Sequence, residues 1–136
     1  MKKLKLDDSP QAEFRGLGIV SPEKDYRLCF LINQKTGWEL EKTATLHIFD
    51  PAGQTRKEVP AFVHTNPENE YRTFLVKNRQ ESFFVVPEMK QADYIILQPF
   101  EQADTMNLIK KLISDITAVQ SCFAISAQNL KHIDAE

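Results

Sequence analysis

The sequence has only two cysteines, Cys29 and Cys122. Two cysteines exclude both a network of disulfides and a zinc site built from four thiolates. Each lies in an apolar segment, so we interpret both as small core residues rather than as nucleophiles. Scarce cysteine is typical of a reducing compartment, and we expect the protein to be cytoplasmic.

An excess of either charge is also missing, because the chain carries 17 basic and 19 acidic residues and a formal net charge of -2. This balance provides no broad positive surface for duplex DNA or an anionic membrane. The longest apolar runs, such as residues 28–32, are far shorter than the roughly 20 residues of a membrane span. The basic start at residues 2–5 leads into Asp7 and Asp8, so we expect no export signal.

Apolar residues are plentiful: they make up 42% of the chain and include nine phenylalanines. This much apolar surface can offset the entropy lost when the chain becomes ordered, so a folded core is expected. No repeat and no long linker divides the sequence. We therefore predict a single domain over residues 1–136, with a polar tail from about residue 127.

Two segments have helical periodicity. The first covers residues 22–34, with Ser21 as N-cap, Pro22 at the first helical position and Gly37 just beyond the end. The second covers residues 104–119 and has an apolar stripe formed by Met106, Leu108, Ile109, Leu112, Ile113 and Ile116.

Between these helices the period changes to two, and turn signals such as residues 50–53 recur about every ten residues. Alternation is weaker at residues 13–20, and residues 121–125 form a final apolar segment. We predict an α+β fold: a mostly antiparallel, five- to seven-stranded sheet, arranged as a meander, with two helices packed on it. The central strands are expected at residues 44–49, 54–64, 71–77, 82–86 and 94–98.

Both faces of this sheet are predicted to be apolar. If His64 pairs with Tyr71, one face collects Val59, Ala61, Val63, Phe74, Val76, Phe83 and Val85. Two helices cover one face only, so curling of the sheet, the termini or another molecule must cover the second. In the last case the protein is a homodimer or binds another cytosolic protein. The candidate interface residues are those of the second face: Phe62, Leu75, Phe84 and Val86.

Signatures of catalysis are lacking. Gly16 and Gly18 precede a helix, as in a dinucleotide-binding motif, but Ser21 replaces the third glycine and no apolar strand comes before them. We interpret these glycines as a flexible turn into the first helix. Since the histidines are widely scattered, we expect no metal site, no cofactor and no enzymatic activity.

The segment 86–94 links two predicted strands and has two interpretations. Pro87 lacks an N–H and ends strand pairing, which favours a structural connector. Alternatively, Glu88 and Asp93 converge beside Tyr94 and bind a cation, an amine or a guanidinium. Asp25 is a further candidate, because it shares a helix face with apolar residues, where a carboxylate should not lie unpaired. The alternative interpretation is structural, since the helix dipole favours a carboxylate in the first turn.

Basic residues interleave with Tyr71 and Phe74 over two predicted strands, a combination that can bind single-stranded RNA by stacking and charge. No RNP1 pattern accompanies them, so solvated strand edges are the preferred interpretation and RNA binding remains an alternative. The basic residues are Arg56, Lys57, Arg72, Lys77 and Arg79.

The segment Val86-Pro87-Glu88 followed by Ala92-Asp93-Tyr94 resembles the signature of the IPExxxVDY family of small bacterial proteins. Valine replaces the first isoleucine, and alanine replaces the valine before the aspartate. Residues 24–30 are similar to the family's first helix, and residues 2–6 to its usual start. The resemblance implies a bacterial cytosolic protein without an assigned activity. It also implies that Asp25, Tyr26 and Arg27 meet Glu88, Asp93 and Tyr94, with Arg27 paired to a loop carboxylate.

From these patterns we predict a non-enzymatic protein-interaction module, either a homodimer or a subunit bound to another cytosolic protein. The alternative is a regulatory domain that binds a small ligand or RNA through Glu88, Asp93, Tyr94 and the basic residues at 72–79. In either case the binding residues are expected among Asp25, Arg27, Glu88, Asp93 and Tyr94.

Overall fold

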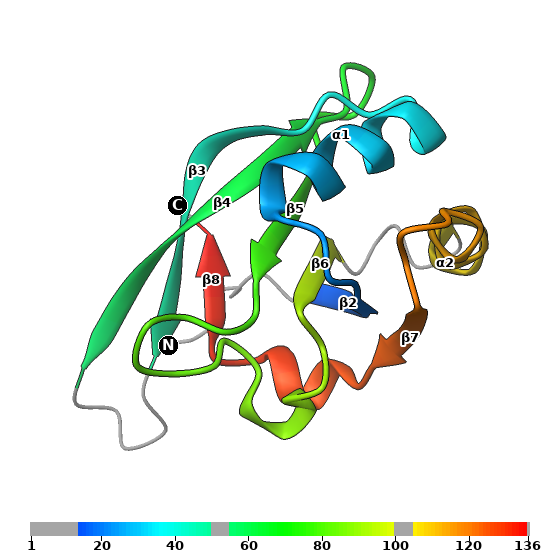
Figure 1. The fold of residues 1–136 in the computed structure, drawn as a ribbon. Coiled ribbons are helices and arrows are strands. Elements are labelled where there is room, and N and C mark those ends of the chain that lie inside the picture. The colour runs from blue at the N-terminus through cyan, green and yellow to red at the C-terminus, as the bar shows by residue number, and fades with distance from the viewer. Residues whose placement is uncertain (1–13, 50–54, 100–104, 136) are drawn as a thin grey trace.

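The computed structural model describes residues 14–49, 55–99 and 105–135. They form a curled, fully antiparallel sheet of seven strands in the order β7-β2-β6-β5-β4-β3-β8 (Figure 1). The predicted α+β fold is therefore confirmed. The strands are β2 (Phe14–Val20), β3 (Glu41–Phe49), β4 (Arg56–Thr65), β5 (Arg72–Lys77), β6 (Tyr94–Pro99), β7 (Ser121–Ile125) and β8 (Ile133–Ala135).

Within the described residues, two α-helices and two short 3-10 helices accompany the sheet: α1 (Asp25–Thr36), α2 (Met106–Ser114), η1 (Pro87–Met89) and η3 (Ala127–Leu130). Helix α1 ends as predicted, because Gly37 adopts the left-handed conformation at φ 81° and donates its N–H to the Asn33 carbonyl. Its predicted start is wrong. Lys24 occupies the N-cap position, while the Ser21 hydroxyl donates to the Ala118 carbonyl at 2.8 Å.

Helix α2 is shorter than the predicted segment 104–119, and Leu108 points outward with 60% of its surface exposed. The predicted turn at residues 50–53, residue 104 and residues 2–6 lie outside the described residues.

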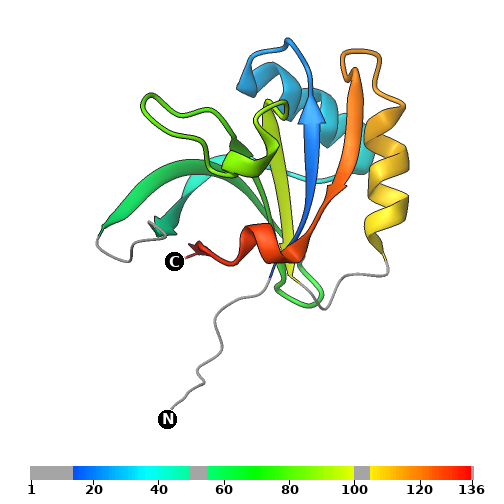
Figure 2. The ribbon, with the colours of Figure 1, turned by 90° about the horizontal axis from the view of Figure 1, so that it is seen from below.

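Each face of the sheet has its own core. Helices α1 and α2 cover one face, and their apolar residues pack on Leu17, Ile19, Phe62, Leu75 and Ile96. On the opposite face Phe74, Val76, Ile95 and Leu97 pack against apolar residues of η3 and β8 and of the segment before η1. Seen from below, η1 and η3 lie in front of the central strands and α1 lies behind them (Figure 2). The chain itself therefore covers both faces.

The predicted faces are correct for β4 and β5, although the predicted register is wrong. His64 pairs with Thr73 rather than with Tyr71, a shift of two residues. Because side chains alternate with a period of two, a shift of two leaves every residue on its predicted face.

The predicted strand at residues 82–86 is wrong. Only a single bridge, Arg79 to Phe84, forms there. The backbone N–H groups of Val85 and Val86 bond instead to the carbonyl and the side-chain oxygen of Asn78, at 2.8 and 2.7 Å. Val86 was predicted on the same face as Phe62 and Leu75. Because of this path, it instead packs beside Val85 in the core on the other face of the sheet.

The C-terminal residues are not a polar tail, as the sequence had suggested. Leu130 and Ile133 are buried in the core beneath β2 and β3, and β8 pairs with β3. His132 fixes this segment by donating from Nε2 to the Val85 carbonyl at 2.6 Å.

Gly16 and Gly18 lie within β2, so the predicted flexible turn is wrong too. A Cβ atom at Gly16 would come 2.8 Å from Leu130, and one at Gly18 would come 2.7 Å from the Phe123 ring. Glycine is needed at both positions because η3 and β7 side chains pack directly on the strand backbone.

Candidate functional site

A polar cleft opens on the α1 side of the sheet, where β5 ends and β6 begins. We call it the Tyr94 cleft, and its volume is about 610 Å³. Its walls come from the β2–α1 connection, from the end of β5 with the residues after it, and from the start of β6. The lining residues are Ser21, Pro22, Glu23, Lys77, Arg79, Gln80, Glu81, Asp93 and Tyr94.

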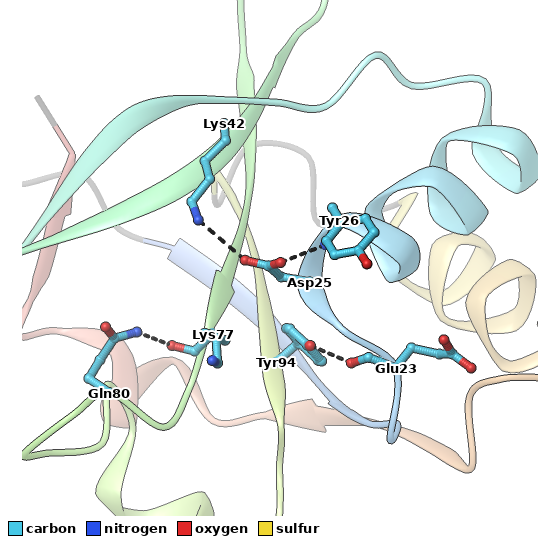
Figure 3. Close-up of polar contacts among 7 residues, drawn as sticks. All are labelled: Glu23, Asp25, Tyr26, Lys42, Lys77, Gln80 and Tyr94. Carbon is cyan, nitrogen blue, oxygen red and sulfur yellow. Dashed lines mark hydrogen bonds and ion pairs between the residues drawn. The ribbon is translucent and has the colours of Figure 1, made fainter.

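Tyr94 forms the floor of this cleft. It is the cross-strand partner of Lys77 in β5 and of Ile19 in β2. Its hydroxyl donates to the Glu23 carbonyl at 2.5 Å, so Tyr94 lies between Lys77 and Glu23 (Figure 3). Burial, reinforced by the negative charges of Asp25, Asp93 and Glu23, raises the pKa of Tyr94 to about 12. The phenol therefore stays protonated at neutral pH and acts as a hydrogen-bond donor.

Asp93 fixes the neighbouring strand ends. Its Oδ2 atom accepts from the Ser21 N–H at 2.9 Å, and its own N–H donates to the Ile19 carbonyl at 2.7 Å. The Asp93 carbonyl accepts from the Asn78 N–H at 3.0 Å. These bonds tie β2, β6 and the residues after β5 together at the edge of the cleft.

Asp25 lies close by, at the first position of α1. One carboxylate oxygen accepts from the Tyr26 N–H at 2.7 Å, and the other pairs with Lys42 of β3 at 3.3 Å (Figure 3). The helix dipole and this lysine thus account for a carboxylate at the helix start. Its charge also contributes to the raised pKa of Tyr94.

Of the predicted binding residues, the structure brings Asp25, Asp93 and Tyr94 together but separates Arg27 and Glu88 from them. The Arg27 guanidinium lies 5.9 Å from the centre of the Phe30 ring, on the outer side of α1. Glu88 is exposed in η1. Among the residues that the structure describes, no ion pair joins Arg27 to Glu88 or Asp93, so the predicted pairing of Arg27 with a loop carboxylate does not form.

The sequence did not indicate that Ser21 and Glu23 belong to the cleft. Ser21 had been assigned to the helix cap, and Glu23 contributes a backbone carbonyl, which no residue pattern marks. Lys77 was predicted among the basic residues, but its pairing with Tyr94 was missed, because the predicted meander placed a strand at residues 82–86 between β5 and β6.

A second surface is formed by the outer side of α1. Tyr26 and Phe30 lie one turn apart, with 66% and 51% of their surface exposed. Beside them a groove of about 470 Å³ separates α1 from residues 116–118, which connect α2 to β7. It is lined by Glu23, Arg27, Leu31, Gln34, Lys35, Ile116, Thr117 and Ala118.

The predicted sheet-face interface is largely internal. Phe62, Leu75 and Val86 expose 8%, 0% and 0% of their surface, because α1, α2 and the segment 85–86 fill the space around them. Only Phe84 is partly exposed, with the Lys90 ammonium 5.7 Å from its ring centre. These side chains leave little apolar surface for a partner at this face.

The aromatic residues considered for RNA stacking are placed unequally. Phe74 is in the core, and the Arg72 guanidinium lies 5.2 Å from its ring centre. Tyr71, the residue before β5, is 36% exposed. These two rings therefore do not form the continuous stacking platform that the RNA-binding alternative requires.

No group of three or more His, Cys, Asp and Glu side chains with metal-binding geometry occurs within residues 14–49, 55–99 and 105–135. Burial raises the pKa of Cys29, and it raises that of Cys122 to about 11, so neither thiol is activated. Over the same residues no helix has the length and apolar character of a membrane span.

Comparison with known proteins gives no match. This holds for family models, for curated proteins and for solved structures. The resemblance to the IPExxxVDY family therefore stays a prediction, and the functional argument depends on the geometry of the two surfaces.

Proposed function

We propose that this protein is a non-enzymatic protein-interaction module, and that it forms a homodimer through the outer side of α1. The observation that carries the proposal is the exposure of Tyr26 and Phe30 on one side of a single helix. Aromatic side chains are enriched in protein interfaces, where a few of them contribute most of the binding energy. Arg27, another residue type favoured in interfaces, lies against Phe30.

The contact has to extend beyond these two rings. A stable interface buries about 800 Å² on each partner, which is more than two aromatic side chains provide. The adjacent groove supplies further area, because Arg27 both contacts Phe30 and lines the groove with Leu31. Together the rings and the groove form one continuous surface.

A second copy of the chain fits this surface by helix orientation. If two α1 helices pack antiparallel about a two-fold axis near Phe30, their helix dipoles are antiparallel, which is favourable.

Light scattering coupled to size exclusion tests the dimer over protein concentrations from micromolar to hundreds of micromolar. We expect a dimer for the wild type and a folded monomer for Phe30→Glu, because the exposed position tolerates the charge while the interface does not. The matched control is Leu108→Glu on α2, an exposed apolar residue away from the groove, which should remain dimeric.

A wild type that stays monomeric throughout this range would overturn the proposal. So would equal dissociation of the Phe30→Glu and Leu108→Glu variants, since the loss would then be unrelated to α1. Circular dichroism of each variant establishes that it is folded.

A cytoplasmic location and a bacterial origin belong to the same proposal. Both cysteines are free thiols in the described structure, which supports a reducing compartment. The similarity of residues 86–88 and 92–94 to the IPExxxVDY signature supports the bacterial assignment.

A further inference from the structure

We infer that the Tyr94 cleft binds a small zwitterion, a molecule that carries both an ammonium and a carboxylate, such as a free α-amino acid. The cleft and the groove beside α1 share Glu23, but neither Tyr26 nor Phe30 lines the cleft, so this inference does not rest on the proposed dimer. Its volume of about 610 Å³ lies within the range of small-molecule sites.

Two cations lie along one wall of the cleft. Lys77 is the last residue of β5, and Arg79 follows two residues later at the bridge to Phe84. Both line the cleft, and no carboxylate in the described residues lies within ion-pair distance of either. Two neighbouring cations favour a bound carboxylate, which a guanidinium can hold through two parallel hydrogen bonds.

Carboxylates line the cleft as well. Glu23 and Asp93 belong to the β2–α1 connection and the residue before β6, while Glu81 comes two residues after Arg79. The Asp93 carboxylate is oriented by the Ser21 N–H at 2.9 Å. Tyr94 lies between Lys77 and the Glu23 carbonyl (Figure 3). A ligand that carries both an ammonium and a carboxylate matches a lining that carries both charges.

The charge of the whole lining favours a zwitterion over a simple anion. Two cations, Lys77 and Arg79, line the cleft together with three carboxylates, those of Glu23, Glu81 and Asp93. A phosphate or a nucleotide would be repelled by the carboxylates, whereas an ammonium on the ligand is stabilised by them.

Hydrogen bonds hold part of the cleft in place. The backbone of Asp93 is bonded to Ile19 on one side and to Asn78 on the other. The Tyr94 hydroxyl donates to the Glu23 carbonyl and so fixes the β2–α1 connection. Groups that are already held in place lose less freedom when a ligand binds.

A thermal-shift screen of the twenty free L-amino acids, each at 10 mM, is the first test. Selective binding to the folded state raises the Tm, and we expect at least one amino acid to do so reproducibly. For the best of them, calorimetry then compares the parent compound with its N-acetyl and its amide derivative. Each derivative lacks one charge, and each should bind at least about tenfold more weakly, a loss of about 1.4 kcal/mol.

Two variants locate the site. Arg79→Gln removes a cation, and Asp93→Asn removes a carboxylate while keeping an oxygen that can accept from Ser21. Both should weaken binding about tenfold or more with little change in the Tm of the free protein. The matched control, Arg72→Gln, removes an exposed arginine at the other end of β5, outside the cleft, and should bind as the wild type does.

Three results would overturn the inference. One is that no amino acid changes the Tm. Another is stabilisation by inorganic phosphate or AMP without any by amino acids, which would define an anion site. The third is equal weakening by Arg72→Gln, which would indicate a non-specific charge effect. Phe30 lies outside the cleft, so Phe30→Glu should leave amino-acid binding unchanged, and the two proposals can fail separately.

Discussion

At the scale of single residues, Asn78 decides how the segment between β5 and β6 is folded. Its side chain is completely buried and makes three hydrogen bonds, donating to the carbonyls of Met89 and Ala92 and accepting from the Val86 N–H. All three partners belong to the motif that the sequence singled out. One asparagine therefore holds the whole connector on the sheet.

We expect Asn78→Ala to destabilise the protein by about 3 kcal/mol, because three buried backbone groups would lose their partners. Urea denaturation followed by circular dichroism measures the loss. Asn107→Ala, on the exposed side of α2, is the control and should change the free energy of unfolding by less than about 0.5 kcal/mol. Equal values for the two variants would contradict the role of Asn78.

His64 makes stability dependent on pH. Its Nδ1 atom accepts from the Glu39 N–H at 3.0 Å, and its ring stacks on Trp38 with centroids 6.0 Å apart. Burial lowers the pKa of His64, against a smaller opposing effect of Glu39. The folded state therefore binds this proton less readily than the unfolded state, and the stability from this contact is present above about pH 6.5 and lost as the pH falls.

We accordingly expect His64→Gln to be about 1 kcal/mol less stable than the wild type at pH 8, the value of one hydrogen bond. The difference should shrink steadily between pH 7 and pH 5. Urea titrations monitored by the fluorescence of Trp38, the single tryptophan, give both curves. A difference that is constant with pH would show that the hydrogen bond to Nδ1 contributes nothing.

The sequence indicated part of the candidate site and missed the rest for identifiable reasons. Asp25, Asp93 and Tyr94 were predicted to meet, and they do, since the charges of both aspartates act on Tyr94. Arg27 was assigned to the same group by the family resemblance alone. The buried side of α1 is formed by Leu28, Cys29 and Ile32, which turns Arg27 outward, as the helical periodicity of the segment indicates.

At the scale of elements, β2 has glycine at the two positions where side chains of β7 and η3 pack directly on its backbone. The Phe123 ring of β7 lies over Gly18, its cross-strand partner, and Leu130 of η3 lies over Gly16. An aromatic ring over a strand glycine restores apolar contact that the missing side chain would otherwise provide.

We expect Gly18→Ala to cost about 1–3 kcal/mol, because the new Cβ would come 2.7 Å from the Phe123 ring. In a Phe123→Ala background the same substitution should cost clearly less. A double-mutant cycle measured by urea denaturation provides this coupling. Additive costs in the two backgrounds would mean that the ring does not set the requirement for glycine.

Most strands could be predicted because alternation with a period of two is a strong signal. Residues 121–125 match β7 completely, and the other predicted strands at 44–49, 71–77 and 94–98 lie within three residues of the observed bounds. Residues 82–86 failed because they are as apolar as a strand, while their backbone partners are on Asn78. A hydrogen-bonding side chain that replaces a strand leaves no trace in the hydrophobic pattern.

At the scale of the whole molecule, the apolar character of both sheet faces has an internal explanation. Helices α1 and α2 cover one face, and the C-terminal residues 127–135 cover part of the other (Figure 2). The sequence required a cover for the second face but identified the tail as polar, because only Leu130 and Ile133 among its last residues are large and apolar. Because the sheet is curled around this core, Leu130 and Ile133 are enough to cover the remaining side.

If the C-terminal residues close this core, truncation of one of their buried side chains must lower the free energy of unfolding as much as truncation of any other core side chain. We expect Leu130→Ala to lower the free energy of unfolding by about 2–5 kcal/mol, the range for a buried leucine. Leu108→Ala should change it by less than about 0.5 kcal/mol, because Leu108 is mostly exposed. Parallel urea denaturations at one concentration, repeated on the Phe30→Glu background, separate this effect from dimer dissociation. A Leu130→Ala variant as stable as the wild type would mean that the second face is covered in another way, and the sheet-face interface would again need to be considered.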